Sequence, residues 1–189
     1  MKADKYARKR MKEVNDAGFS QRWGAYRWVQ SDLRMASEDS EEPQQFDIVL
    51  VMNTSLGGEE TYPALALIGP ADEYQQRSVV ELYSGMDVYP SRWSLLPRPP
   101  EHRNSGELRN SPWVSVDEGV PEPNEHLWLL AYGANYLTAL VIPKDAGDGR
   151  TALVHPITIL GGRAGDLYFG DYIFNASHWA YLPTDSEMN

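Results

Sequence analysis

FDIVLVMNTSLGGEETYPALALIG, residues 46–69, contains two strand patterns joined by a turn. Residues 46–52 are almost all apolar and rich in β-branched side chains, which is typical of a central strand covered on both faces. Residues 53–60 indicate a turn, because Asn, Ser and Gly cluster there. Residues 62–69 predict a second strand, and Pro63 at its opening suits a strand start or an edge position.

Two helices are predicted on the N-terminal side of this stretch. Residues 4–17 form a basic amphipathic pattern, with Ala7, Met11 and Val14 at helical spacing on one face. Residues 20–36 form a second helical pattern, whose core-facing members are Trp23, Tyr26, Val29, Leu33 and Ala36. The acidic run at 37–43 ends this helical part, which covers residues 1–42.

Strands continue on the C-terminal side, interrupted by a proline-rich segment. Residues 78–85 predict a third strand, so that strands occupy 46–96. Residues 97–124 hold six of the 13 prolines and indicate a long loop. Residues 125–183 return to strand patterns, beginning with a hairpin. The expected fold is therefore a single α+β domain over 1–189: two N-terminal helices followed by a mainly antiparallel β-sheet with a long Pro-rich loop.

Charge is unevenly distributed along the chain. Residues 1–18 contain six Lys or Arg and three acidic residues, whereas residues 19–189 contain 11 basic and 24 acidic residues, a net of −13. An acidic surface repels phosphate backbones, so nucleic acid is an unlikely partner. The acidity suits solubility alone, or a protein partner with a basic surface.

Several classes of protein are excluded or disfavoured by what the chain lacks. There is no cysteine, which excludes disulfides, thiolate catalysis and Cys-type zinc sites. Phosphate-binding glycine loops, the G-x-S-x-G elbow and the H-E-x-x-H motif are all absent. No signal peptide or membrane-spanning apolar run is found, so we expect a cytoplasmic protein that needs no cofactor.

Scattered carboxylates and histidines leave an enzymatic alternative open. Asp166 and Asp171 lie five residues apart on an aromatic-rich stretch, as a pair of catalytic carboxylates could. His126, His155 and His178 belong to the predicted C-terminal strands, and neighbouring strands could bring them together around a metal. Their spacing matches no known motif, so we assign no metal ligand and no catalytic residue.

Four bulky side chains are predicted as partner-binding anchors. Trp28 and Met35 lie away from the core-facing stripe of the second predicted helix, and Trp93 and Trp113 add two large aromatic side chains. Trp is typical of interface hot spots, and Met adapts its shape to a partner. The acidic residues predicted to steer a basic partner toward them are Glu38, Asp39, Glu41 and Glu42.

The leading hypothesis is a non-enzymatic protein-binding protein that acts by occluding a partner through an acidic, aromatic-rich surface. Its small, acidic, Trp-rich composition is similar to that of many immunity proteins, phage-encoded inhibitors and virion accessory proteins. One alternative is a structural component of a larger assembly such as a virus particle, in which case the chain forms homo-oligomers. The other is a small hydrolase or metal-dependent enzyme using Asp166, Asp171 and the histidines.

Overall fold

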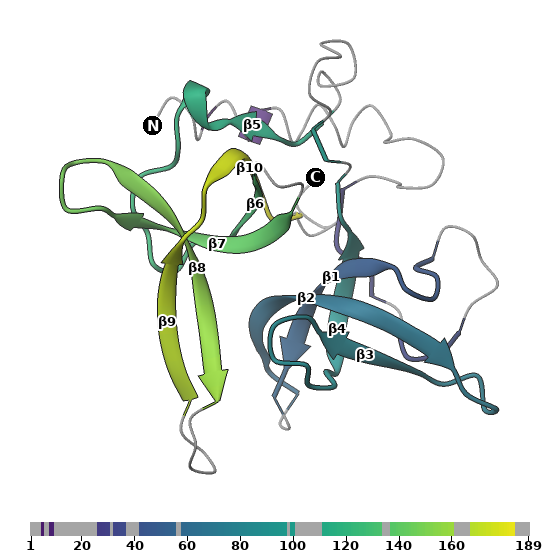
Figure 1. Cartoon of the computed structure of the whole chain (residues 1–189). Helices are drawn as coiled ribbons and strands as arrows, with labels where there is room; N and C mark the ends of the chain where they lie inside the picture. Colours follow the sequence, from purple (N-terminus) through teal and green to yellow (C-terminus); the bar gives the residue numbers. More distant parts are fainter. Residues whose placement is uncertain are drawn as a thin grey trace. The chain divides into compact units, whose positions relative to one another are not determined.

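The chain forms two compact units, each built on its own antiparallel sheet (Figure 1). The β1–β4 unit comprises residues 18–96 and 183–189, and the β5–β10 unit comprises residues 1–17 and 97–182. The computed structural model describes residues 5, 8–9, 26–30, 32–36, 42–55, 58–97, 99–100, 111–133, 137–160 and 167–183.

The β1–β4 unit begins with the two strands expected from residues 46–69. The strands are β1 (Ile48–Thr54), β2 (Glu60–Ala71), β3 (Arg77–Glu81) and β4 (Pro90–Leu95), in the order β3-β2-β1-β4. β1 lies between β2 and β4, and Val49, Leu50 and Val51 are all fully buried. The prediction of a central strand covered on both faces is therefore confirmed.

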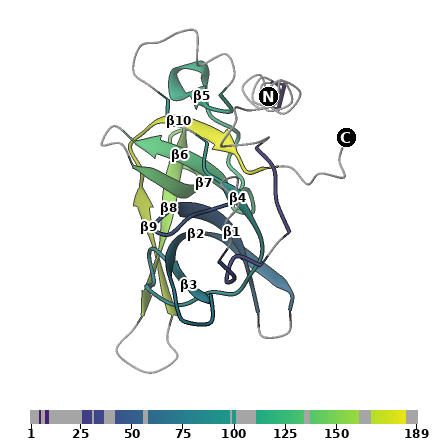
Figure 2. The ribbon, with the colours of Figure 1, turned by 90° about the vertical axis from the view of Figure 1, so that its right-hand side faces the viewer.

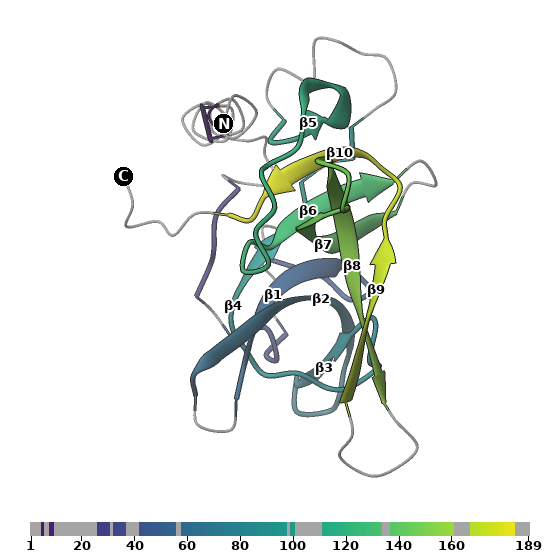
Figure 3. The same cartoon turned by 90° about the vertical axis from the view of Figure 1, so that its left-hand side faces the viewer.

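The sheet curls and closes on itself through the segment that follows β3. The Glu81 N–H donates to Met86 O (2.9 Å) and the Val88 N–H donates to Val79 O (2.8 Å), so residues 86–88 line the outer side of β3. The chain then continues as β4, which pairs with β1. One continuous segment thus reaches both edges of the sheet, and Figures 2 and 3 show the strands curving round a common centre. The core inside contains Leu33, Val49, Val51, Ala64, Ala66, Ile68, Val79, Val88 and Trp93.

Residues 26–30 and 32–36, which we call the strap, fill the remaining gap between β4 and β3. At one end Val29 and Trp93 exchange backbone hydrogen bonds of 2.7 and 2.9 Å. At the other end the Ala36 N–H donates to Gln75 O (2.8 Å) and the Arg77 N–H donates to Arg34 O (2.8 Å). Leu33 lies between the two ends and is only 2% exposed. The strap is therefore an irregular part of the barrel wall that pairs with the sheet at both ends.

The strap overturns the predicted second helix and, with it, the α+β class. Tyr26 and Leu33 are buried as their spacing indicated, but Tyr26 lies at a bend and Leu33 in a turn that the Met35 N–H closes by donating to Asp32 O (3.2 Å). Aromatic and β-branched residues have low helix propensity, and hydrogen bonds to two edge strands outweigh a short helical pattern. Of the predicted helix at 4–17, only Lys5, Arg8 and Lys9 are described, with helical backbone, and the rest lies outside the described residues. The protein is mainly β, with two sheets.

The β5–β10 unit contains a six-stranded antiparallel sheet in the order β5-β10-β6-β7-β8-β9. Its strands are β5 (Val114–Ser115), β6 (Leu129–Gly133), β7 (Thr138–Asp145), β8 (Thr151–Leu160), β9 (Leu167–Ile173) and β10 (Ala176–Tyr181). β6 and β7 form the hairpin that the sequence predicted. Trp113 and Trp179 are fully buried, and the Trp179 Nε1–H donates to Gly119 O (2.7 Å). β8 and β9 extend from the sheet as a two-stranded ribbon (Figure 3).

The proline-rich segment at 97–124 begins where one unit ends and the other starts. It also contains regular structure, namely β5 and the 3-10 helix η2 (Val116–Glu118), which Ser115 caps. The single domain over 1–189 remains a prediction. Within the described ranges, no helix has the length and apolar character needed to cross a bilayer.

Candidate partner-binding surface

Three of the four predicted anchors lie in the interior of their units. Trp28, Trp93 and Trp113 are 7%, 3% and 1% exposed. The Arg92 guanidinium lies 4.9 Å from the centre of the Trp28 ring, and Trp93 belongs to the barrel core. Of the four, Met35 is the one whose side chain is exposed, and it lies on the strap. Because a buried side chain cannot meet a partner unless the fold opens, the three tryptophans are core residues here.

Of the predicted acidic residues, Glu42 is described, whereas Glu38, Asp39 and Glu41 lie outside the described residues. Glu42 is near the guanidinium of Arg77, which is 5% exposed. Arg77 donates from Nε to Leu33 O (2.6 Å) and from Nη1 to Pro43 O (2.8 Å). Burial lowers the Arg77 pKa, and the Glu42 carboxylate opposes that shift. Glu42 therefore has a neighbour of opposite charge within its own unit.

Of the residues of the enzymatic alternative, the described histidines His126, His155 and His178 form no metal-binding group. His155 is on β8 and His178 on β10, with β7 and β6 between them, a separation of about 14 Å at the usual strand spacing. Asp171 lies on β9 opposite Pro156, and Asp166 is outside the described residues. Across the described part of the chain, no three His, Asp or Glu side chains are grouped so that they could hold a metal ion.

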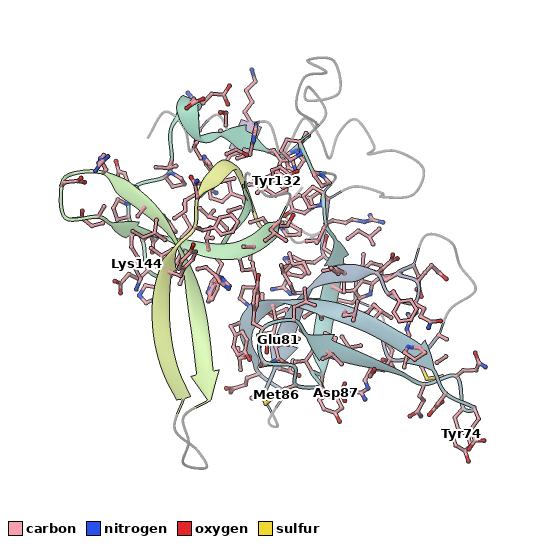
Figure 4. All side chains as sticks on the ribbon, in the orientation of Figure 1. Tyr74, Glu81, Met86, Asp87, Tyr132 and Lys144 are labelled. Atoms are coloured by element: carbon pink, nitrogen blue, oxygen red, sulfur yellow. The ribbon has the colours of Figure 1, made fainter. Side chains whose placement is uncertain are left out.

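Exposed apolar side chains concentrate instead on the β1–β4 unit. It carries nine of the twelve large hydrophobic residues that are exposed in the described part of the chain. They lie toward two opposite ends of the barrel, as the labels of Tyr74 and Met86 show in Figure 4. The Phe46 end, where β1 begins and β2 ends, carries Met35, Phe46, Ile48 and Tyr74. The Glu81 end, where β3 ends and the following turn begins, carries Tyr62, Leu82, Tyr83, Met86 and Tyr89.

Phe46 occupies a backbone conformation that is unusual for its type. Its φ is 70°, in the left-handed region, and its side chain is 67% exposed. A turn holds it there, because the Asp47 N–H donates to Gln44 O (3.0 Å) and the Gln44 N–H donates to Asp47 Oδ2 (2.8 Å). The Phe46 N–H donates to Ile68 O (2.8 Å), which fixes the turn to β2. A bulky aromatic is therefore held in a position that usually favours glycine or asparagine.

The charge around these apolar residues is negative. Residues 18–96 contain 12 acidic and five basic residues, a net of −7. Two of the described arginines there are neutralised within the unit, Arg34 by Asp87 and Arg92 by Glu60, both at 2.8 Å, and Arg77 is buried. Near the Phe46 end, Asp72 and Glu73 are exposed, whereas Asp47 is half-buried and accepts a hydrogen bond from the Gln44 N–H. The surface can therefore attract a basic partner and offer it apolar contacts.

At the Glu81 end, a carboxylate is buried among hydroxyl groups. Glu81 is 8% exposed, and its Oε2 accepts hydrogen bonds from Ser84 Oγ (2.8 Å) and the Tyr62 hydroxyl (3.4 Å). Burial raises the Tyr62 pKa, and the neighbouring Glu81 carboxylate raises it further, so the hydroxyl stays protonated and donates at neutral pH. This group of side chains holds a negative charge in place.

Neither Phe46 nor Glu81 was singled out from the sequence. Phe46 was expected to open a strand, because no glycine or asparagine marks it as a turn residue. Glu81 had a usable signal, since it interrupts the apolar run at 79–82. Comparisons of the chain with protein family models, with curated proteins and with solved structures found no significant match.

Proposed function

We propose that the chain is a non-enzymatic binding protein that attaches to a basic protein partner through the Phe46 end of the β1–β4 unit. The observation that carries the proposal is Phe46 itself. A left-handed conformation costs an L-residue about 1 kcal/mol or more relative to glycine. Strained residues are retained where they serve a function, and an exposed ring contributes little to the core of its own chain.

The surroundings of Phe46 support a protein as the ligand. Ile48 and Tyr74 provide further exposed apolar area at the same end, and Met35 on the strap provides an adaptable contact. Asp47, Asp72 and Glu73 add negative charge, which would steer a basic surface toward the ring. Aromatic anchors with a charged rim are typical of interfaces that bind by occlusion.

The test compares two substitutions that remove the same ring. In Phe46→Ala the backbone strain stays, whereas in Phe46→Gly it is relieved, so the Gly variant should be more stable than the Ala variant by about 1 kcal/mol. Both variants should lose the heterologous protein that the tagged wild-type chain captures stoichiometrically from its native lysate, as measured by native mass spectrometry. Loss of binding in the more stable variant cannot be attributed to unfolding.

The matched control is Tyr172→Ser on β9 of the β5–β10 unit, which removes another exposed aromatic ring and should leave capture unchanged. Full capture by Phe46→Gly would refute the proposal. Capture of copies of the same chain alone, in a ring or array, would instead favour the structural component of a larger assembly.

A further inference from the structure

Glu81 is a buried carboxylate that forms no ion pair with the described residues of its unit. Glu81 on β3 pairs with Ala66 on the neighbouring strand β2. Ala66 belongs to the barrel core, so the Glu81 side chain lies on the core face of the sheet. Hydroxyl groups of Ser84 and Tyr62 both donate to Oε2. In the described part of the chain, both donors contact Oε2, and Oε1 is not among the buried side-chain atoms without a hydrogen-bond partner, so Oε1 is open to solvent and to a ligand.

This arrangement differs from that of two other acidic residues of the same barrel. Asp87 is paired with Arg34 and Glu60 with Arg92, each at 2.8 Å, although both acids are far more exposed than Glu81. Removing a carboxylate from water is costly unless hydrogen bonds and an opposite charge compensate. Two hydroxyl donors compensate in part. A cation delivered by a ligand would complete the compensation.

The side chains around Glu81 suit the stem and head of a lysine. Tyr62 donates to the carboxylate, and the Glu81 N–H donates to Met86 O, which places Met86 across the turn (Figure 4). Tyr62, Leu82, Tyr83 and Met86 are each more than one-third exposed. Tyrosine faces attract ammonium groups, and apolar side chains cover a methylene stem.

Lysine fits the open acceptor better than arginine. A guanidinium binds carboxylates most strongly through two parallel hydrogen bonds, one to each oxygen. Here Oε2 already accepts two hydroxyl groups, so a single oxygen is open to a new donor. An ammonium is a compact charge that needs one acceptor at a time.

We infer that the Glu81 end is a binding site for a lysine side chain of a protein or peptide, with Glu81 as the charge partner and Tyr62, Tyr83 and Met86 as its walls. This site and the surface of the proposed function have one thing in common, namely that each would bind a basic partner. They lie at opposite ends of the barrel, so either can fail without the other.

The test is a titration of the full chain with a short synthetic peptide of alternating glycine and lysine, followed by backbone amide chemical shifts. The amides of Glu81, Ser84 and Met86 should shift saturably, and the same peptide with acetylated lysines should cause no shift. Glu81→Gln, which keeps an oxygen for the hydroxyl donors, should weaken binding about tenfold, or about 1.4 kcal/mol. Tyr83→Ala, an exposed position, provides a second variant that leaves the buried group intact and should also weaken binding.

Glu73→Gln is the matched control, because it removes the same charge at the other end of the barrel. Phe46→Gly should bind the peptide as the wild type does. Absence of saturable shifts, or equal weakening by Glu73→Gln and Glu81→Gln, would overturn the inference. Equal affinity for the arginine version of the peptide would overturn the choice of lysine.

Discussion

Phe46 and Glu81 each break a local rule that most of the chain obeys. Phe46 adopts a left-handed φ of 70° where glycine would be unstrained, and Glu81 is an acid that is 8% exposed on the core face of a strand. Residues that conflict with local preference are expected at functional positions, because elsewhere selection removes them. Conflict with the local environment is therefore a better guide to this surface than the count of tryptophans.

Buried tyrosines should make the fold sensitive to alkaline pH. Tyr26 is 4% exposed, and burial raises the pKa of its phenol well above the ordinary value of 10.0. The unfolded chain ionises near that ordinary value while the folded chain does not, so unfolding releases protons above about pH 10. The free energy of unfolding should stay level below about pH 9.5 and fall as the pH rises further.

Chemical denaturation at pH values from about 8 to about 11 tests this. Tyr26→Phe removes the phenol and should flatten the decline in unfolding free energy, even if the variant is less stable throughout. Tyr74→Phe changes an exposed tyrosine of the same unit and serves as the control. Identical slopes for Tyr26→Phe and wild type would contradict the expected role of burial.

At the scale of elements, the period of the apolar pattern and the length of the segment that carries it decided which strands and helices were predicted correctly. The run at 46–52 is apolar throughout and β-branched, so β1 could be placed centrally, and the β6–β7 hairpin followed from its turn residues. The strap could not be predicted, because its helical spacing is short and its real hydrogen-bond partners lie about 40 to 60 residues away. The candidate surface was missed for the same reason: it depends on distant segments meeting.

Leu33 should hold the strap against the barrel. It is 2% exposed within the core cluster, so Leu33→Ala should lower the free energy of unfolding by about 3 kcal/mol. The Val29 and Ala36 amides, which donate to Trp93 O and Gln75 O, should exchange with deuterium faster than the amides of β1. Met35→Ala, at an exposed position on the same strap, should change stability by less than about 1 kcal/mol. Uniform acceleration in all strands would show that the strap does not open separately.

At the scale of the whole molecule, charge and apolar exposure divide between the two units. Nine of the twelve exposed large hydrophobic residues of the described chain are on the β1–β4 unit, whose residues 18–96 carry a net charge of −7. Six of the nine basic residues within 1–36, and all lysines but Lys144, fall in the first 12 residues, which precede this unit. The described part of the β5–β10 unit, in which Trp113 and Trp179 are fully buried, carries three such exposed residues.

Partner binding should therefore depend on salt mainly through the association rate. Raising the salt concentration from ~0.05 M to ~0.5 M should lower the association rate constant about tenfold, because screening removes long-range steering. The dissociation rate should change little, since apolar contacts at Phe46 are not screened. Stopped-flow or surface-immobilised measurements would show this, and a dissociation rate that carries the whole salt effect would argue against steering by the acidic surface.

The way the barrel closes also limits how any partner can attach. Both edge strands of the four-stranded sheet already have hydrogen-bonded neighbours. Residues 34–36 and 86–88 bond to β3 and the turn before it, and Val29 bonds to β4. Many proteins recognise a ligand by accepting it as an additional strand, and free edges also invite aggregation. Those edges are occupied here by the chain itself. A partner of this unit must therefore bind to side chains and not to the backbone of an edge strand. Binding should then be sensitive to single substitutions, and the unit should resist cross-β self-association.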